Sequence, residues 1–191
     1  MNYLFDYLVF IGRFQPFHLA HMQTIKIALK QSHNIILALG SAQNERNIKN
    51  PFTVSEREYM ILSNFSETDQ NRIQFVHVVD LYDDQKWQKL VTSLVEKVVE
   101  SESKVGLIGH FKDDSSYYLQ LFPEWPLVEL DSLKGAISAT PLREAYYQGE
   151  IIESALPLGS SEFLHNFQKT RTYQQLQYKY LTQDKTNLDE S

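Results

Sequence analysis

Short apolar runs alternate with segments of helical periodicity from the first residues to about Leu130. Runs typical of strands buried on both faces lie at 8–11, 34–40, 73–79 and 105–109, with 126–130 as a candidate fifth. Apolar residues spaced three and four apart lie between these runs, and one such segment opens on the capping-box spacing Thr53-Val-Ser-Glu56. This alternation predicts an α/β fold, a doubly wound parallel sheet whose ligand sites lie at the carboxyl ends of the strands.

The pattern changes in the last third of the chain. A helix is expected to start at Thr140, with Thr140 as its cap and Pro141 in its first turn, and to stop at Gly149. From Ser160 the apolar spacing favours one or two further helices with no strand between them. We therefore expect one domain over residues 1–181 with a helical carboxyl end, followed by a polar, flexible tail over residues 182–191.

Composition excludes several classes of protein. A length of 191 residues allows one domain, and 42% hydrophobic residues supply a core. The absence of cysteine removes disulfide scaffolds, Cys-ligated metal sites and thiol nucleophiles. A formal charge of -6 makes nucleic acid a poor partner, the first residues are not typical of a secretory signal, and no apolar run approaches the length of a membrane span. We expect a cytoplasmic protein with no nucleic-acid or membrane partner.

The sequence Gly12-Arg-Phe-Gln-Pro-Phe-His-Leu-Ala-His21 follows the first predicted strand directly. Gly12 lets a ligand approach the backbone, and a helix start offers free N–H groups, so a phosphate fits here. His18 and His21 are expected one turn apart on one helix face. The same spacing could bind a metal, but no glutamate lies between the histidines and no third ligand is near. Phe14 is expected mainly in the core.

The sequence Ile137-Ser-Ala-Thr-Pro-Leu-Arg143 places two hydroxyl groups and an arginine at a second helix start. A cation in the first turn opposes the helix dipole. Arg143 is therefore either solvated there or positioned to meet an anion. Neither a Walker loop nor a Gly-x-Gly-x-x-Gly turn is present, which argues against P-loop nucleotidases and ordinary dehydrogenases.

Together these two motifs resemble the paired signature of the nicotinamide-nucleotide adenylyltransferase family. The segments Gly40-Ser-Ala-Gln43, Asn50-Pro-Phe-Thr53 and Glu56-Arg57 are similar to the branch of the family that includes archaeal enzymes. Residues 109–125 resemble the adenylyltransferase domain that some bacteria fuse to a Nudix hydrolase. The resemblance runs from about Tyr7 to about Tyr180. It implies a nucleotidyltransferase fold of the Rossmann-like type and transfer of AMP from ATP to nicotinamide mononucleotide, giving NAD and pyrophosphate in NAD biosynthesis or salvage.

The resemblance also implies site residues. His18, His21 and Arg143 would be catalytic, stabilising charge on the phosphates. The implied ATP-binding residues are Gly12, Arg13, Phe14, His18, His21, Lys49, Ile137, Ser138, Thr140 and Arg143. The implied mononucleotide-binding residues are Gln15, Gly40, Asp80, Asp84 and Trp87. Magnesium would be held by the substrate phosphates, with no metal ligands from the protein.

Alternatives remain open at several of these positions. Trp87 could stack on the cationic nicotinamide ring, or it could simply begin the apolar stripe of its helix. Lys112 and Asp113 could border the phosphate site or form an ordinary surface pair. Adenylyl or cytidylyl transfer to another phosphorylated acceptor, such as phosphopantetheine, would use the same phosphate-binding residues, and a non-catalytic nucleotide-binding regulatory module is a further alternative. A homo-oligomer is also left open.

Overall fold

The computed structural model describes residues 2–111, 114–131 and 137–186. The chain forms two compact units, each built from separate stretches of sequence. The first unit comprises Met1–Arg13, Ala20–Gln43 and Phe65–Ala136, and the second comprises Phe14–Leu19, Asn44–Asn64 and Ile137–Ser191.

The first unit contains a five-stranded sheet in which every neighbouring pair is parallel. Its strands are β1 (Phe5–Gly12), β2 (Ser32–Leu39), β3 (Ile73–His77), β4 (Val105–Gly109) and β5 (Leu127–Glu129), in the order β3-β2-β1-β4-β5. Gly12 pairs with Leu39, and Leu39 with His77, so the carboxyl ends of β1, β2 and β3 are level. The strand order reverses between β1 and β4, which is where open α/β sheets bind ligands.

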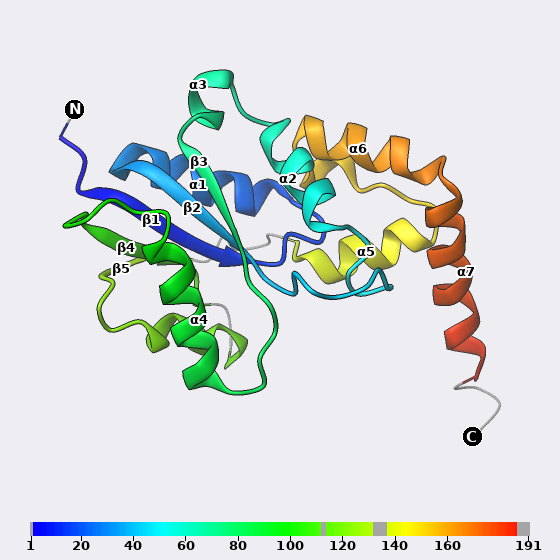
Figure 1. The fold of residues 1–191 in the computed structure, drawn as a ribbon. Coiled ribbons are helices and arrows are strands. Elements are labelled where there is room, and N and C mark those ends of the chain that lie inside the picture. The colour runs from blue at the N-terminus through cyan, green and yellow to red at the C-terminus, as the bar shows by residue number, and fades with distance from the viewer. Residues whose placement is uncertain (1, 112–113, 132–136, 187–191) are drawn as a thin grey trace. The chain divides into compact units, whose positions relative to one another are not determined.

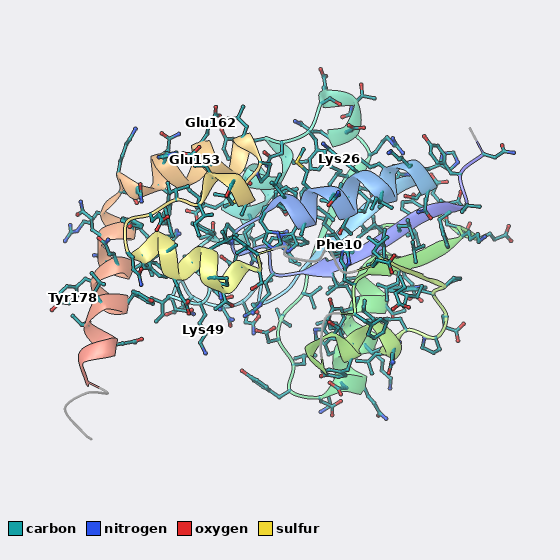
Figure 2. The ribbon with its side chains drawn as sticks, turned by 180° about the vertical axis from the view of Figure 1, so that it is seen from behind. Phe10, Lys26, Lys49, Glu153, Glu162 and Tyr178 are labelled. Carbon is teal, nitrogen blue, oxygen red and sulfur yellow. The ribbon has the colours of Figure 1, made fainter. Side chains whose placement is uncertain are left out.

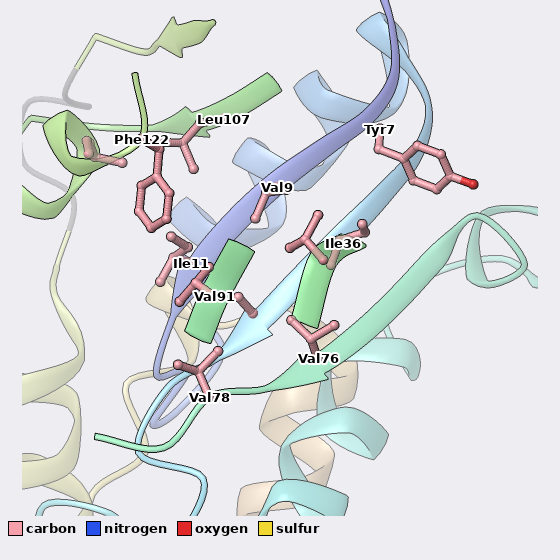
Figure 3. Packing of buried hydrophobic residues seen from close by; sticks show 12 residues of the cluster. Tyr7, Val9, Ile11, Ile36, Val76, Val78, Val91, Leu107 and Phe122 are labelled. Carbon is pink, nitrogen blue, oxygen red and sulfur yellow. The ribbon is translucent and has the colours of Figure 1, made fainter. Parts of the chain in front are cut away.

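Helices cover both faces of this sheet, with α1 (Leu19–Gln31) on one face and α4 (Asp84–Glu96) on the other (Figure 1). Val9 and Ile11 of β1 share a buried cluster with Val91 of α4, as Figure 3 shows. The intervening residue Phe10 points to the opposite face, where its ring centroid lies 6.1 Å from that of His21 in α1. The prediction of a doubly wound parallel sheet is confirmed.

Shorter elements complete the first unit, and helices make up the second. The first unit also contains α3 (Glu67–Gln70) and the 3-10 helix η1 (Asp114–Leu121). The second contains α2 (Val54–Leu62), α5 (Ala139–Tyr147), the 3-10 helix η2 (Glu153–Ala155), α6 (Leu158–Gln168) and α7 (Arg171–Thr186). The predicted capping box is present, with Thr53 and Glu56 each accepting the other's backbone N–H. Helices α6 and α7 form the carboxyl end, which agrees with the expected one or two helices after Ser160.

Aromatic side chains form the core of the second unit. Phe52, which precedes α2, lies edge-on to Phe167 of α6 with ring centroids 5.2 Å apart. Tyr146 of α5 lies 4.8 Å from Tyr173 of α7, and the Tyr173 hydroxyl donates a hydrogen bond to the Tyr146 carbonyl. Burial raises the pKa of the Tyr146 hydroxyl well above its usual value. This cluster connects the segment before α2 to helices α5, α6 and α7.

Two local predictions are wrong. Helix α5 begins at Ala139 with Ser138 at its cap, whereas Thr140 was expected there. Proline fits any position whose N–H has no intrahelical partner, so Pro141 did not locate the start to a single residue. His18 lies just before α1 and not within it, so the two histidines do not share a helix face.

Helix α7 continues through Thr186, so residues 182–186 of the expected tail are helical, and the rest of that tail lies outside the described residues. Gly149, the predicted stop signal of α5, has a φ of +91° and lies just past the helix end. Of the helices within the described ranges, none is long and apolar enough to cross a membrane.

Candidate active site

The carboxyl edge of the sheet brings Gly12, Arg13 and Gly40 together. The Gly40 N–H donates a 2.9 Å hydrogen bond to the Gly12 carbonyl. A Cβ atom at position 40 would lie 3.5 Å from the Cγ atom of Arg13, an ordinary van der Waals contact, so the end of β2 lies directly beside this arginine. Arg13 itself is exposed. The ends of β1 and β2 thus offer close backbone approach and a solvent-facing cation in one place.

The turn after Arg13 is held by a side chain that forms two hydrogen bonds to one residue. Gln15 Nε2 donates to the Phe52 carbonyl at 2.9 Å, and Gln15 Oε1 accepts the Phe52 N–H at 3.0 Å. Gln15 is only 1% exposed, and its peptide bond to Pro16 is cis. Phe14, with a φ of +53°, is buried beside Phe17, as the core interpretation expects.

The two histidines differ in environment. His18 is 2% exposed and belongs to the turn of the second unit. His21 lies in the first turns of α1, is half-buried, and its ring is tilted against Phe10. An imidazole beside a glycine-ended strand can donate a hydrogen bond to a phosphate oxygen.

Arg143 is oriented by two oxygen atoms at the start of α5. Its Nη1 donates to the Gln15 carbonyl at 2.7 Å, and its Nη2 donates to Thr140 Oγ1 at 3.3 Å. Arg143 as a residue is 9% exposed, whereas Ile137, Ser138 and Thr140 are exposed. The Ser138 side chain makes no cap hydrogen bond. This helix start therefore combines a fixed cation with exposed hydroxyl groups, which suits binding of an anion.

The segment from residue 44 to residue 53 carries Lys49 and is anchored at several points. Arg46 forms a two-bond ion pair with Glu56, with Nη1 to Oε2 at 2.7 Å and Nη2 to Oε1 at 3.0 Å. The Tyr147 hydroxyl donates to the Ile48 carbonyl at 2.9 Å. Lys49 is exposed and its side chain extends away from the ribbon (Figure 2). The segment thus presents a cation to solvent from an ordered backbone.

The Tyr147 hydroxyl, which anchors the segment 44–53, has a shifted pKa. Burial raises the pKa of the Tyr147 hydroxyl, and the positive charge of Arg143, one turn earlier, partly offsets that rise. Tyr147 therefore stays protonated at physiological pH and remains a donor to the Ile48 carbonyl.

Of the five residues implied for the mononucleotide, Gly40, Asp80, Asp84 and Trp87 lie in the first unit, whereas Gln15 lies in the second. The Asp80 N–H donates to Gln43 Oε1 at 3.0 Å, which connects the segment after β3 to the segment after β2. Asp84, in the first turn of α4, accepts a 2.8 Å hydrogen bond from the Tyr117 hydroxyl, and this bond and the carboxylate charge raise the pKa of Tyr117. Trp87 packs edge-on against Phe122 with ring centroids 5.8 Å apart. Asp80, Asp84 and Trp87 thus each have a defined contact within the protein, in addition to the implied contact with the mononucleotide.

Sequence inspection missed His110. It follows β4 directly, at the strand-order reversal, and its Nδ1 lies 3.2 Å from the Leu130 carbonyl. Its Nε2 lies 3.1 Å from Thr24 Oγ1 in α1. Because a carbonyl only accepts, Nδ1 carries a proton in this arrangement. Its position right after the glycine that ends a predicted buried strand was the available signal.

The second unit contains a cavity that is separate from the predicted site residues. The cavity, of about 350 Å³, lies between α2 and α6, and none of the predicted site residues lines it. Across residues 2–111, 114–131 and 137–186, no three His, Cys, Asp or Glu side chains gather into a group that could hold a metal ion. Lys112 and Asp113 lie outside the described residues.

A parallel sheet in which β1 and β4 end in glycines, together with a helix start that carries the fixed Arg143, fits the class of nucleotidyltransferases. In agreement, residues 9–78 match the cytidylyltransferase-like family. The chain is 66% identical over 186 residues to a nicotinamide/nicotinic acid mononucleotide adenylyltransferase of Acinetobacter baylyi, covering 97% of this chain and 99% of that protein. The chain therefore belongs to the nicotinamide/nicotinic acid mononucleotide adenylyltransferase family.

More distant relatives point the same way. A nicotinamide-nucleotide adenylyltransferase of Thermococcus kodakarensis is 28% identical over 158 residues, which cover 82% of this chain and 80% of that protein. A crystal structure of a bifunctional NMN adenylyltransferase/ADP ribose pyrophosphatase from Francisella tularensis superposes with a TM-score of 0.87 at 35% identity. That match covers 98% of this chain but 57% of the bifunctional protein. A second structure of the Francisella protein, with a TM-score of 0.86, is complexed with AMP and a manganese ion.

Proposed function

We propose that this protein transfers AMP from ATP to nicotinamide mononucleotide, releasing NAD and pyrophosphate. The observation that carries the proposal is the start of α5, where the Gln15 carbonyl and the Thr140 hydroxyl orient the Arg143 guanidinium beside exposed hydroxyl groups. A cation fixed at a helix start serves a reaction whose leaving group is a polyanion. The near full-length Acinetobacter relative supports this acceptor over phosphopantetheine.

The phosphate-binding roles follow from charge and position. We assign the β and γ phosphates of ATP to Arg143, Ser138 and Thr140, with Lys49 as an additional cation. His18 and His21 would stabilise charge at the reacting phosphorus. The remaining implied positions would complete the ATP site. Arg13 would contribute its side chain, and Gly12, Phe14 and Ile137 would contribute backbone groups.

The mononucleotide would be recognised from the first unit. Asp80 and Asp84 supply carboxylates, Trp87 an aromatic face for the cationic nicotinamide ring, and Gly40 a backbone without a side chain. The Gln15 side chain is not assigned to the mononucleotide, because both of its polar atoms form hydrogen bonds with the backbone of Phe52. We therefore propose a positioning role for Gln15.

We propose that Mg²⁺ enters with ATP, held by the substrate phosphates. The absence of a ligand cluster in the described ranges is compatible with this proposal. When bound, the ion would neutralise charge on the departing pyrophosphate. The side chains then have to align two anionic substrates, which Arg143 and the two histidines can do by hydrogen bonding and charge. The cytoplasmic location and any homo-oligomer stay predictions.

The reaction itself provides the first test. The protein is incubated with ATP, MgCl₂ and nicotinamide mononucleotide, and pyrophosphate and NAD are measured together. We expect the two products in equal amounts, with nicotinic acid mononucleotide, phosphopantetheine and ribose 5-phosphate as parallel acceptors. Pyrophosphate release with phosphopantetheine but not with either pyridine mononucleotide would overturn the assignment of the acceptor. Binding of ATP without any transfer would instead support a regulatory module.

A second prediction concerns proton transfer. A phosphate monoester has its second pKa near 6, so the nucleophile is largely a dianion at neutral pH and needs no protein base. Activity should therefore rise through about pH 6 and then remain level. Asp80→Asn should raise the KM for the mononucleotide by about tenfold with little change in kcat, since Asp80 would bind the acceptor without taking a proton.

Asp69→Asn is the matched control, because Asp69 lies in α3 before the amino end of β3, whereas Asp80 follows the carboxyl end of that strand. Both variants are assayed at saturating ATP and Mg²⁺. A kcat for Asp80→Asn reduced by about 1,000-fold and restored by raising the pH would reveal a protein base and contradict this mechanism.

A further inference from the structure

Gln15 lies at the centre of a chain of hydrogen bonds in the second unit. Its side-chain amide forms both bonds that a peptide group can offer, to the carbonyl and the N–H of Phe52. Its main-chain carbonyl accepts the 2.7 Å hydrogen bond from Arg143 Nη1. With 1% exposure, the residue is shielded from water, which strengthens these bonds.

Each end of this chain of bonds carries a group assigned to ATP. Phe52 belongs to the segment 44–53, three residues after Lys49. At the other end Arg143 continues through Nη2 to Thr140 Oγ1. Gln15 thus connects the segment that presents Lys49 to the helix start that presents Arg143.

We propose that Gln15 is a positioning residue for ATP binding, acting through Arg143 and the Lys49 segment without touching the nucleotide. The inference rests on the proposed function, because it takes Arg143 and Lys49 as phosphate contacts. The side-chain amide fixes residue 15, and residue 15 in turn fixes the carbonyl that orients the guanidinium. An arginine binds two phosphate oxygens well only when its planar fork is held in the right orientation.

The chemistry of the amide is specific. Phe52 presents one acceptor and one donor, so its partner must supply one of each at the same reach. Methionine fills similar space without either. Glutamate matches the pair only when it is protonated, because its ionised form has no donor for the Phe52 carbonyl. These two substitutions therefore separate hydrogen bonding from packing.

The first experiment compares Gln15→Met with Gln70→Met. Gln70 also donates a side-chain hydrogen bond to a backbone carbonyl, that of Phe65, but it lies in α3 of the first unit. The Kd of Mg-ATP is measured by calorimetry without the acceptor, and kcat and both KM values are measured by product formation. We expect Gln15→Met to weaken ATP binding by about tenfold with a smaller change in the KM for the mononucleotide, and Gln70→Met to match the wild type.

The second experiment uses Gln15→Glu and does not depend on Gln15→Met being folded. The ratio of its ATP Kd to that of the wild type is followed from about pH 8 down to about pH 5.5. Burial raises the pKa of a carboxyl group, so the variant should gain a proton in this range and recover the donor to Phe52. We expect the ratio to fall toward one as the pH falls. A ratio that stays well above one down to about pH 5.5 would overturn the proposal.

A double-mutant cycle tests whether Gln15 acts through Arg143. Gln15→Met and Arg143→Lys are combined in one variant. Its loss of ATP-binding free energy should be smaller than the sum of the losses in the two single variants, whereas the losses of Gln70→Met and Arg143→Lys should be additive. Full additivity at Gln15, or equal losses for both substrates, would assign it to general stability and overturn the proposal. The Kd measurements need ATP binding only, so absence of NAD formation by the wild type would contradict the proposed function alone. Absence of ATP binding by the wild type would overturn both.

Discussion

Replacing Arg143 by alanine is expected to lower kcat/KM for ATP by about 1,000-fold, the largest effect of any single change in this protein. The guanidinium would be lost from the start of α5, and with it the paired donors for the phosphates of the leaving group. Arg143→Lys should fall between the wild type and Arg143→Ala, because lysine keeps the charge but not the planar fork. Steady-state kinetics with varied ATP at saturating mononucleotide measure both effects.

Arg171→Ala is the matched control for Arg143→Ala. Arg171 is an exposed arginine in the first turn of another helix of the same unit, α7. It should leave kcat/KM unchanged. If Arg143→Ala remained folded by circular dichroism and lost less than about tenfold in kcat/KM, the assignment of Arg143 to the phosphates would be wrong.

Replacing His21 by alanine should lower kcat by about 100-fold or more while the fold is retained. His21 is half-buried in α1 and contacts Phe10, so its loss removes a donor to the reacting phosphate but little of the core. The KM for ATP should change less than kcat, since the charge that His21 stabilises develops in the transition state.

His33→Ala serves as the control for His21→Ala. His33 is an exposed histidine of the same unit and stacks edge-on against Tyr3. Thermal unfolding of both variants shows whether either effect is structural. A kcat for His21→Ala within a few-fold of the wild type would assign His21 to packing beside Phe10.

The elements that sequence predicted best are those whose ends are marked locally. β4 was predicted at the bounds that it has, because a run of buried residues there ends in Gly109. The capping box at Thr53 is likewise a local pattern. The predicted start of α5 was wrong because Pro141 is compatible with several positions of a first turn. Ser138 and Thr140 are both residue types that cap helices, so the sequence did not distinguish between them.

What could not be predicted depends on contacts between distant residues. His110 has partners in α1 and after β5, and no local spacing connects them. The family resemblance implies Gln15 as a mononucleotide contact, because Gln15 belongs to the motif from Gly12 to His21. Only the folded chain shows that Phe52 uses both of its polar side-chain atoms.

The separation of these partners along the chain has a consequence for synthesis on the ribosome. Gln15 forms hydrogen bonds with Phe52, which lies 37 positions later in the chain, and with Arg143, which lies 128 positions later. The hydrogen bond between Ile48 and Tyr147 spans 99 positions. Contacts at such separations close only after the intervening chain exists. Strands β1 to β4 can pair while translation continues. The residues assigned to ATP acquire their geometry only when α5 has emerged, so a nascent chain would gain nucleotide affinity late, as one of its last folding steps.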